Sequence, residues 1–555
     1  MLPYNENQER PLAVSDSPQN PLRLYHARTK HAFDAYAEGP GQLDWDAQPA
    51  PFRHYPGAPV LELPLAADRF ERAYGRLAEQ PPAPVPPALE SLGALFELSF
   101  AISAWKSWGP NRWALRCNPS SGNLHPVEAW ALCGGLPGVP DGLHHYDPER
   151  HALEHRVLVP PGDATPWLAI ALSSVMWREA WKYGERAFRY CQLDVGHALG
   201  ALAYAAELLG WRLRPLAIGG DELGGLLGLD RETDFPAGRY AYTEREEAEI
   251  LLVVDAPGLA APPPSASLRA HHDGAGWLGR PSRIDPAPGY RWPLVDQAAV
   301  ASRTPESIPV SAPPGKLDEF PPLPPHPTTA GAAQLIRQRR SGQRFDPRQT
   351  LPRAAFLRLL DATLPRPRAP FIGQTAPAQV HLLLFVLRVD GLDSGLYLLP
   401  RGGAGDQLAA TLAARFPDAT PVDDCPPHLG LRRLTRASLP ELQRLARALN
   451  CHQDIAATSA FSLGMLADFT TADGAGYREL LREAGRVGQA LYLEAEAAGV
   501  RGTGIGCFFD DPVHEVAGLG GERWQSVYHF TVGTPVIDER IESSPPYPQR
   551  QQEES

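Results

Sequence analysis

A short basic run in the second half of the chain carries the side chains best suited to hold a phosphate. It comprises Arg339, Arg340, Ser341 and Arg344, and it follows an amphipathic stretch at residues 332–336. A guanidinium group is a planar fork that pairs two phosphate oxygens at once, and a serine hydroxyl can reach a third oxygen. The run therefore fits a phosphate monoester. A solvated basic helix end, favoured by the helix dipole, is the alternative interpretation.

A second chemical feature is a frame of proline, glycine and proline that occurs twice. Residues 119–126 read Pro-Ser-Ser-Gly-Asn-Leu-His-Pro, and residues 370–377 read Pro-Phe-Ile-Gly-Gln-Thr-Ala-Pro. Only the first copy has the polar Ser120, Ser121 and Asn123 at its variable positions. The difference indicates a ligand that is bound at one copy and was lost from the other.

A third feature is the glycine-rich segment Gly-Thr-Gly-Ile-Gly at residues 502–506. We expect a loop there, because glycines let backbone amides approach a flat ligand closely. The segment lacks the Lys-Ser or Lys-Thr ending of a P-loop, and it does not open a helix directly after a strand as a Rossmann fingerprint does. On its own it is equally consistent with a structural turn.

The elements around these motifs repeat in the same order. Each frame leads into an apolar strand, each half has a helix bracketed by two glycines, and each half closes on a strand rich in β-branched and aromatic residues. The apolar runs are residues 127–132 and 380–389, the helices lie between Gly196 and Gly210 and between Gly485 and Gly499, and the closing strands are residues 249–255 and 527–532. Helices that are apolar nearly all round belong in an interior. The chain is therefore predicted to contain two related α+β domains.

Proline marks the boundary between these domains. The chain has 60 prolines, about twice the usual share of roughly 5%, and they cluster at residues 261–271 and 312–328. Such a segment is extended and semi-rigid, and its aromatic residues Trp277, Tyr290 and Trp292 indicate that it lies against the domains. We expect a first domain at residues 1–260, a linker at 261–328, a second domain at 329–540 and a disordered tail at 541–555.

Composition excludes several classes of function. The chain has 64 acidic and 52 basic residues and a net charge of −12, which disfavours nucleic acid as a partner. No window approaches the roughly 18 apolar residues of a membrane span, so we expect a cytoplasmic protein without a membrane partner. The six cysteines include no Cys-x-x-Cys pair and no histidine at zinc spacing. Neither a disulfide framework nor a metal site is expected.

Together these motifs resemble the nitroreductase family of FMN enzymes. The resemblance rests on the basic run, the Pro-Ser-Ser-Gly-Asn frame, the Gly-Ile-Gly at residues 504–506 and the late Arg540. The first half is similar to the SagB-type dehydrogenase branch through three strings: Tyr-His-Ala-Arg-Thr-Lys-His at 25–31, Leu-His-His-Tyr at 143–146 and Trp-Lys-Tyr-Gly-Glu-Arg-Ala-Phe-Arg-Tyr at 181–190. The chain thus resembles a tandem, two-domain form of that branch.

The resemblance implies where FMN would bind. In this family the flavin lies between two subunits, and here the two halves would form that pair within one chain, as a monomeric pseudo-dimer. The implied FMN ligands are Arg339, Arg340, Ser341, Arg344, Gly504, Ile505, Gly506 and Arg540 from the second half and Pro119, Ser120, Ser121 and Asn123 from the first. Phe371 and Ile372 replace the serines in the second frame, so one FMN per chain is expected. His26, Thr29 and Lys30 remain candidates for a divergent phosphate clamp of a second site.

The resemblance also implies a catalytic pair, Lys182 and Tyr183. An ammonium group beside a phenol stabilises the phenolate and lowers the pKa of the tyrosine, so Tyr183 could take a proton while a hydride leaves the neighbouring carbon for the flavin. The alternative is that Lys182 is a surface charge and Tyr183 is a core ring with a solvated hydroxyl.

The function implied is that of an FMN-dependent oxidoreductase. We expect it to dehydrogenate a heterocycle or another peptide-derived substrate, with oxygen as a natural electron acceptor. Reduction of nitro compounds or quinones by NAD(P)H is a second enzymatic reading. A non-catalytic scaffold in a peptide-modifying complex is the alternative from another class, and retention of one matched ligand set across the halves argues against it.

Overall fold

The computed structural model describes residues 20–551 except 78, 80–81, 159–164, 275, 306–317 and 375. The first half contains a sheet of β1 (Val60–Glu62), β4 (Val127–Gly134), β5 (Gly142–Asp147), β6 (Ala152–Leu158), β7 (Trp167–Ser174), β8 (Arg212–Pro215) and β9 (Glu247–Asp255). The second half contains a sheet of β10 (Val380–Val386), β11 (Gly395–Leu399), β12 (Thr420–Pro421), β13 (Arg432–Arg436), β14 (Phe461–Asp468), β15 (Arg501–Ile505) and β16 (Trp524–Gly533). A third, smaller sheet joins β2 (Ile102–Trp108), β3 (Asn111–Arg116) and β17 (Glu542–Ser544).

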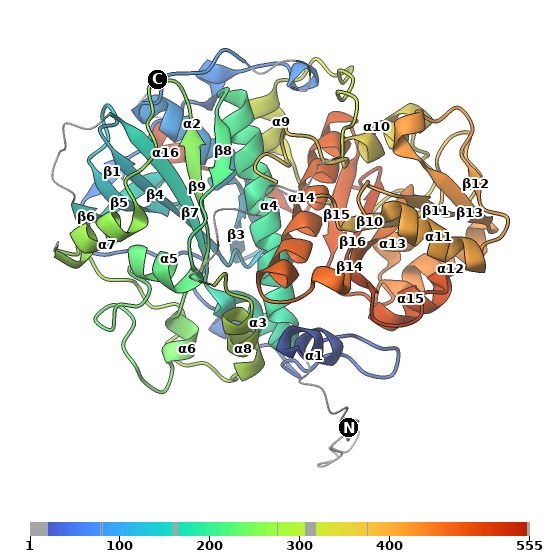
Figure 1. The fold of residues 1–555 in the computed structure, drawn as a ribbon, viewed down its shortest axis with the longest axis horizontal. Helices are drawn as coiled ribbons and strands as arrows, with labels where there is room; N and C mark the ends of the chain where they lie inside the picture. The colour runs from blue at the N-terminus through green and yellow to red at the C-terminus, as the bar shows by residue number, and fades with distance from the viewer. Residues whose placement is uncertain are drawn as a thin grey trace.

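Helices cover these sheets and separate the two large ones (Figure 1). In the first half they are α1 (Pro21–Arg28), α2 (Leu89–Ser99), α3 (Met176–Tyr183), α4 (Ala187–Leu208), α5 (Gly220–Leu226) and α6 (Ala241–Glu244), followed by α7 (Ser265–Gly274) and α8 (Pro293–Ala301). In the second half they are α9 (Ala332–Gln338), α10 (Arg353–Asp361), α11 (Gly405–Arg415), α12 (Leu439–Leu449), α13 (Asp454–Thr458), α14 (Ala475–Ala497), α15 (Asp510–Ala517) and α16 (Pro548–Gln551).

The two large sheets have the same topology. Their strand orders are β1-β6-β5-β4-β7-β9-β8 and β12-β13-β11-β10-β14-β16-β15, and neighbouring strands are antiparallel. The orders match from the second strand onward, and only the outer strands β1 and β12 come from different places in their halves. The predicted pair of related α+β domains is confirmed.

Two long helices, α4 and α14, pack against each other between the sheets (Figure 1). Every residue of α4 is buried, as its nearly continuous apolar sequence predicts. The prediction that these helices begin at Gly196 and Gly485 is wrong, because α4 begins at Ala187 and α14 at Ala475. Both glycines lie inside the helices, where they mark the crossing point and not an end.

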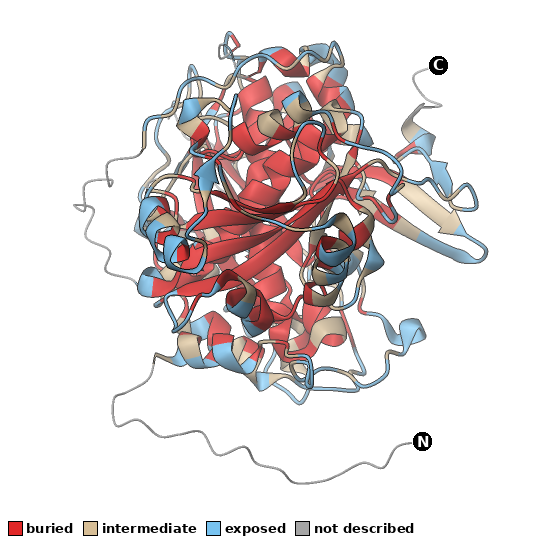
Figure 2. Ribbon diagram, turned by 90° about the vertical axis from the view of Figure 1, so that its right-hand side faces the viewer, coloured by how far each residue is buried: buried red, intermediate tan, exposed pale blue. Residues whose placement is uncertain are grey.

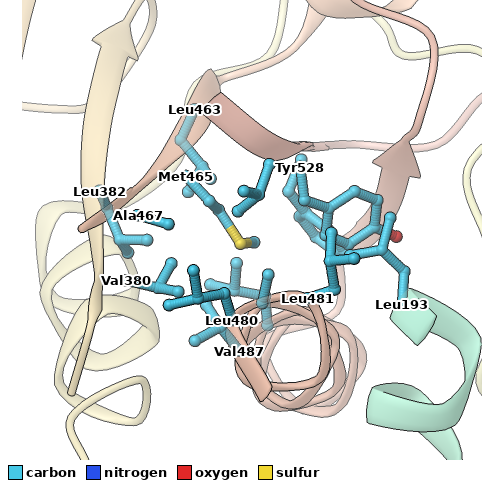
Figure 3. Packing of buried hydrophobic residues seen from close by; sticks show 14 of the residues in the cluster. Leu193, Val380, Leu382, Leu463, Met465, Ala467, Leu480, Leu481, Val487 and Tyr528 are labelled. Atoms are coloured by element: carbon cyan, nitrogen blue, oxygen red, sulfur yellow. The ribbon is translucent and has the colours of Figure 1, made fainter. Parts of the chain in front are cut away.

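Helix α14 also anchors the core of the second half (Figure 3). Apolar side chains of the helix face those of the neighbouring strands. They are Leu480, Leu481 and Val487 of α14, Val380 and Leu382 of β10, Leu463, Met465 and Ala467 of β14, and Tyr528 of β16. Figure 2 shows that the strands and central helices are buried, whereas exposed residues gather on the peripheral helices and loops. In the part of the chain that the structure describes, no helix is long and apolar enough to cross a membrane.

The two ends of the chain cross to the opposite halves. Helix α1 lies on the second half, where His26 Nδ1 is 3.0 Å from the hydroxyl of Tyr477. At the other end β17 pairs with β2, and the hydroxyl of the buried Tyr547 donates to the carbonyl of Pro148 at 2.8 Å. The prediction of a disordered tail at 541–555 is therefore wrong for residues 542–551. The ring of Tyr547 anchors that segment despite its polar surroundings.

The expected linker at residues 261–328 is more regular than its proline content predicts. It contains α7 and α8, and Trp277 packs against the first half, where the guanidinium of Arg156 lies 5.5 Å from its ring centroid. Part of the expected linker, residues 306–317, lies outside the described residues.

Candidate functional site

A cavity of about 450 Å³ lies between the two halves, and both contribute to its wall. The wall includes ten of the twelve FMN ligands predicted from the sequence: Pro119, Ser120, Ser121, Asn123, Arg339, Arg340, Ser341, Gly504, Ile505 and Gly506. The predicted catalytic Tyr183 lines it as well. Three motifs that are far apart in the sequence therefore meet at one site.

Five cationic side chains line this cavity: Lys106, Arg116, Arg339, Arg340 and Arg501. None of them forms a salt bridge with a carboxylate of the described residues, whereas the nearby Arg337 pairs with Glu97 at 3.0 Å. Burial and the neighbouring charge of Arg339 lower the pKa of Arg340 to about 10. Cations that repel one another without a counter-charge favour the binding of an anion.

Arg339 is one of the two most deeply buried of these cations, with 4% of its surface exposed, against 3% for Arg116. Its Nη2 donates to the carbonyl of Arg116 at 3.2 Å, and its guanidinium lies 4.9 Å from the ring centroid of Tyr492. Its Nε and Nη1 have no hydrogen-bond partner among the described residues. Buried charged donors without acceptors are costly, so an anionic oxygen in the cavity would stabilise this arginine.

The segment at 502–506 differs from the loop that was predicted. Its first four residues belong to β15, an edge strand that pairs only with β16. Thr503 Oγ1 donates to the carbonyl of Gly342 at 2.6 Å, which ties the basic run to this strand. The glycines leave this part of the strand without side chains. A larger residue would not fit at Gly504, because its Cβ would lie 1.7 Å from the hydroxyl of Tyr528.

Tyr492 of α14 connects the basic run to the same strand. Its hydroxyl lies 3.0 Å from Ser341 Oγ and accepts a hydrogen bond from the backbone N–H of Gly504 at 3.0 Å. The helix, the basic run and the strand are thereby held in one arrangement around the cavity.

Two predicted phosphate ligands are not brought to the cavity wall. Arg344 has an exposed side chain, and Arg540 is 74% exposed and pairs with Asp538 at 2.6 Å. Asp538 itself lines the cavity, so these arginines lie near its rim.

The serines of the first frame form hydrogen bonds with a side chain of α4. Ser120 Oγ and Ser121 Oγ donate to the carboxylate of Asp194 on α4 at 2.7 and 2.9 Å. Asn123 is also engaged, because its Nδ2 donates to the carbonyl of Ala114 at 2.9 Å and its Oδ1 lies 3.0 Å from His125 Nε2. These polar groups fix the shape of the frame, and burial raises the pKa of Asp194 to about 7.

The predicted catalytic pair lies against Gly122 of that frame. A Cβ at Gly122 would meet the hydroxyl of Tyr183 at 2.5 Å and the Nζ of Lys182 at 2.9 Å. The expectation that Lys182 lowers the pKa of Tyr183 is not supported. Burial and then the charge of Glu179 hold the pKa of Tyr183 well above its usual range, and burial lowers that of Lys182. The phenol therefore keeps its proton at neutral pH.

The string at residues 181–190 has a structural role that its sequence did not reveal. Arg186 and Arg189 bind the buried carboxylate of Asp510 at 2.9 and 2.8 Å, across the contact between the halves. The same carboxylate accepts the backbone N–H of His31 at 3.0 Å. The string therefore also joins the N-terminal arm and the second half.

A second cavity of about 520 Å³ lies at the pseudo-symmetric position, between residues 371–374 and β8. Four arginines line it, and carboxylates pair three of them: Arg214 lies 3.3 Å from Asp255, Arg366 lies 2.5 Å from Asp361 and Arg368 lies 2.5 Å from Glu207. Arg212 forms no salt bridge with a described residue. Phe371, which replaces Ser120, is buried in its wall. Among the described residues, this cavity thus has one unpaired cation, whereas the first has five.

The candidates for a divergent second clamp lie elsewhere. Lys30 pairs with Asp511 at 2.6 Å, Thr29 Oγ1 donates to the carbonyl of Tyr25 at 2.8 Å, and His26 contacts Tyr477. None of the three lines the second cavity, so the structure does not support a clamp there.

Sequence reasoning missed several residues of the wall. Lys106 and Arg116 come from the hairpin of β2 and β3, and Asp194 from the middle of α4. Arg501 follows the glycine that ends the long helix, as Arg212 does in the first half, so the repeat itself pointed to Arg501. For the hairpin residues no motif in the sequence signalled their position.

Comparisons with known proteins agree with this fold. The model of the Nitroreductase family matches residues 336–534. The curated protein Putative nitroreductase MJ1384 from Methanocaldococcus jannaschii is 29% identical over 104 residues, which cover 17% of this chain and 52% of that protein. The chain thus spans about half the length of this relative.

Two solved structures are also similar. A putative nitroreductase from Anabaena variabilis has a TM-score of 0.64 at 21% identity, and the match covers 93% of this chain and 100% of that chain. A putative nitroreductase in complex with FMN from Exiguobacterium sibiricum has a TM-score of 0.23 at 13% identity, covering 37% of this chain and 88% of that chain. Residues 336–534 thus match the Nitroreductase family model, and the fold of the chain as a whole is similar to that of the Anabaena protein.

Proposed function

We propose that the chain is an FMN-dependent oxidoreductase that binds one FMN in the cavity between its halves. The main support is the buried Arg339, whose Nε and Nη1 lack acceptors, within a group of five cations that carboxylates leave unpaired. A phosphate monoester supplies both the negative charge and the acceptor oxygens that this group needs.

The residues present fit FMN at both ends. Arg339, Arg340, Ser341 and Arg501 would hold the phosphate, with Lys106 adding charge at the same cavity. The glycines of β15 and the frame at residues 119–126, which contains Gly122, leave room for a flat ring system between them. Arg344 and Arg540, at the rim, would contribute less than the sequence resemblance implies.

Bound FMN would supply a centre that accepts or releases a hydride. The role of this chain's own residues is to orient the substrate and move a proton. Tyr183, protonated at neutral pH and lying on Gly122, would donate its proton to the reacting substrate atom. The ammonium of Lys182 would stabilise negative charge that develops beside it.

Two reactions are consistent with that arrangement. The Lys182-Tyr183 string supports dehydrogenation of a heterocycle in a peptide-derived substrate, with oxygen as the acceptor, as in the SagB-type branch that the first half resembles. The raised pKa of Tyr183 supports reduction of a nitro compound or quinone by NAD(P)H, because a reduction needs a proton donor whereas a dehydrogenation needs a base.

The experiment that tests the proposal begins with colour. We expect the purified protein to show a flavin spectrum, or to acquire one on addition of FMN followed by gel filtration. Colourless protein that takes up no FMN would favour the scaffold interpretation and overturn the proposal. The yellow protein is then mixed without oxygen with NADPH, or with a peptide containing a thiazoline or oxazoline. The compound that bleaches the flavin identifies the direction of electron flow.

A further inference from the structure

Two half-buried cysteines, Cys451 and Cys507, meet beside the cavity. Their Sγ atoms are 2.7 Å apart, and both are free thiols in the structure. Cys507 follows Gly506 and is one of the residues that line the cavity. The other four cysteines do not line this cavity.

The pair is held by hydrogen bonds on both sides. Gln453 Nε2, two residues after Cys451, donates to the carbonyl of Cys507 at 3.1 Å. The backbone N–H of Phe509, two residues after Cys507, donates to the carbonyl of Leu449 at 2.9 Å. These bonds fix the turn that carries Cys451 against the segment that carries Cys507.

The backbone at Cys451 is shaped for this contact. Cys451 and His452 both adopt the left-handed conformation, with φ of 51° and 59°. Such conformations are rare outside glycine and persist where the surroundings impose them. Asn450 supplies part of that support, because its Nδ2 donates to the carbonyl of Ala446 at 2.7 Å and its Oδ1 lies 2.8 Å from His529 Nδ1.

The two thiols differ in acidity. A hydrogen bond from Cys451, followed by the neighbouring His31 and the charge of Arg186, lowers the pKa of Cys507 to about 5. The proximity of Cys507 raises the pKa of Cys451. The remaining titratable groups around the pair are Tyr36, Tyr183, Tyr190 and Asp510. Cys507 thus has the character of an attacking thiolate, and Cys451 that of a resolving thiol.

We propose that Cys451 and Cys507 are a second redox site, a dithiol that low-molecular-weight disulfides oxidise reversibly through the cavity. The Cys507 thiolate attacks one sulfur of the small disulfide, forms a mixed disulfide and releases one small thiolate. Cys451 then loses its proton to solvent and attacks the Cys507 sulfur, which expels the second small thiolate. Two electrons pass from the protein to the small disulfide, and two small thiols are formed. The thiol chemistry does not use the flavin, although the small disulfide would enter the cavity that is proposed to hold FMN.

The full-length protein, first reduced and desalted, is incubated with glutathione disulfide and analysed by mass spectrometry. We expect a mass lower by about 2 Da and a cross-link between the peptides that contain Cys451 and Cys507. Added dithiothreitol should restore the original mass. Recovery of both residues as free thiols under these conditions would overturn the proposal. This experiment requires no variant.

Variants separate the roles of the two sulfurs. Cys451→Ser should trap glutathione on Cys507 and raise the mass by about 305 Da, whereas Cys507→Ser should take up none at Cys451. Cys425→Ser is the matched control, since Cys425 is also half-buried but lies away from the cavity, and it should form the cross-link as the parent does. Circular dichroism melting checks the fold of each variant, and Cys451→Ala replaces Cys451→Ser if the latter unfolds. Failure of Cys507 to trap glutathione in either folded Cys451 variant would contradict its assigned role.

Discussion

Gly196 of α4 and Gly485 of α14 face each other where the two central helices cross, so closely that a Cβ built on either one would lie 2.8 Å from the Cα of the other. The helices belong to different halves, and both also contribute to the cavity, α4 through Asp194 and α14 through Tyr492. The distance between the helix backbones at this crossing therefore sets the width of the proposed FMN site.

Replacement of Gly485 by alanine should force the halves apart. The added Cβ would meet the carbonyl oxygen of Leu193 at 2.2 Å, and backbone cannot swing aside as a flexible side chain does. We expect a loss of about 1 to 3 kcal/mol or more in the free energy of unfolding, measured by urea titration. Gly224→Ala is the control, because its Cβ would meet only Ala248 at 4.0 Å, and it should be close to neutral.

One FMN per chain is expected. In the second cavity carboxylates already pair three of the four arginines, so phosphate binding there would require breaking pairs such as Arg368 with Glu207. The test is to denature the yellow protein and compare the amount of released flavin with the amount of protein. A ratio near two would show that the second cavity also binds FMN.

Arg501 and Arg212 form a matched pair for testing the phosphate site, because they begin the corresponding strands β15 and β8. Arg501→Ala removes a charge-assisted contact of about 1.5 to 3 kcal/mol, so FMN should bind about 10 to 150 times more weakly. Arg212→Ala should leave the dissociation constant unchanged, and Arg344→Ala should change it little. Fluorescence titration of apoprotein with FMN measures the dissociation constant of all three variants. Equal effects of Arg501→Ala and Arg212→Ala would contradict the assignment of Arg501 to the phosphate.

Tyr183→Phe should slow flavin reduction by about 100-fold or more, since a positioned proton donor usually contributes that much. The yellow colour should remain, because the proposed phosphate contacts come from other residues. Lys182→Met should behave similarly, and the double variant should be little worse than either single one because the two groups act as a unit. Anaerobic rapid mixing with the substrate that bleaches the parent gives the rate. If Tyr183→Phe were reduced as fast as the parent, Tyr183 would be a packing residue.

Asp510→Asn should destabilise the chain strongly. Burial alone would raise the pKa of Asp510, but the charges of Arg186 and Arg189 hold it well below its usual range. A lowered pKa contributes stability that is present above the unfolded value of about 3.9 and is lost as pH falls below it. At pH 7 the variant leaves two buried arginines unpaired, at a cost of about 3 to 5 kcal/mol.

The half-exposed Asp511 provides the control for that prediction. Its pair with Lys30 is near the surface, so Asp511→Asn should cost at most about 1 kcal/mol. Urea unfolding at pH 7 and pH 3 measures both variants. The difference between the parent and Asp510→Asn should be smaller at pH 3, and a difference that grows in acid would contradict the assigned ion pairs.

Repetition made the fold predictable from the sequence. Two copies of the same proline frame, apolar strand and glycine-spaced helix cannot arise from local propensity alone, so they revealed two related domains before any contact was known. The helix starts were misplaced because Gly196 and Gly485 were interpreted as ends. Their role depends on a helix from the other half, and no local pattern records such a contact.

The candidate site was predictable where a motif supplied it. Arg339, Arg340 and Ser341 line the cavity as expected. Lys106 and Arg116 were missed because a hairpin brings them there through tertiary packing. The pKa of Tyr183 was misjudged for a related reason, since sequence adjacency to Lys182 was visible whereas burial and the charge of Glu179 were not.

The crossing of the chain ends has a consequence for how the two cavities can change. In a pair of identical chains, every substitution alters both sites together. Here the halves are parts of one chain, so each cavity is built from its own set of residues. Contacts of α1 with the second half and of β17 with the first hold the halves together. A single replacement such as the phenylalanine at 371 therefore reaches one cavity and leaves the other intact, which allows two copies of one domain to become unequal partners.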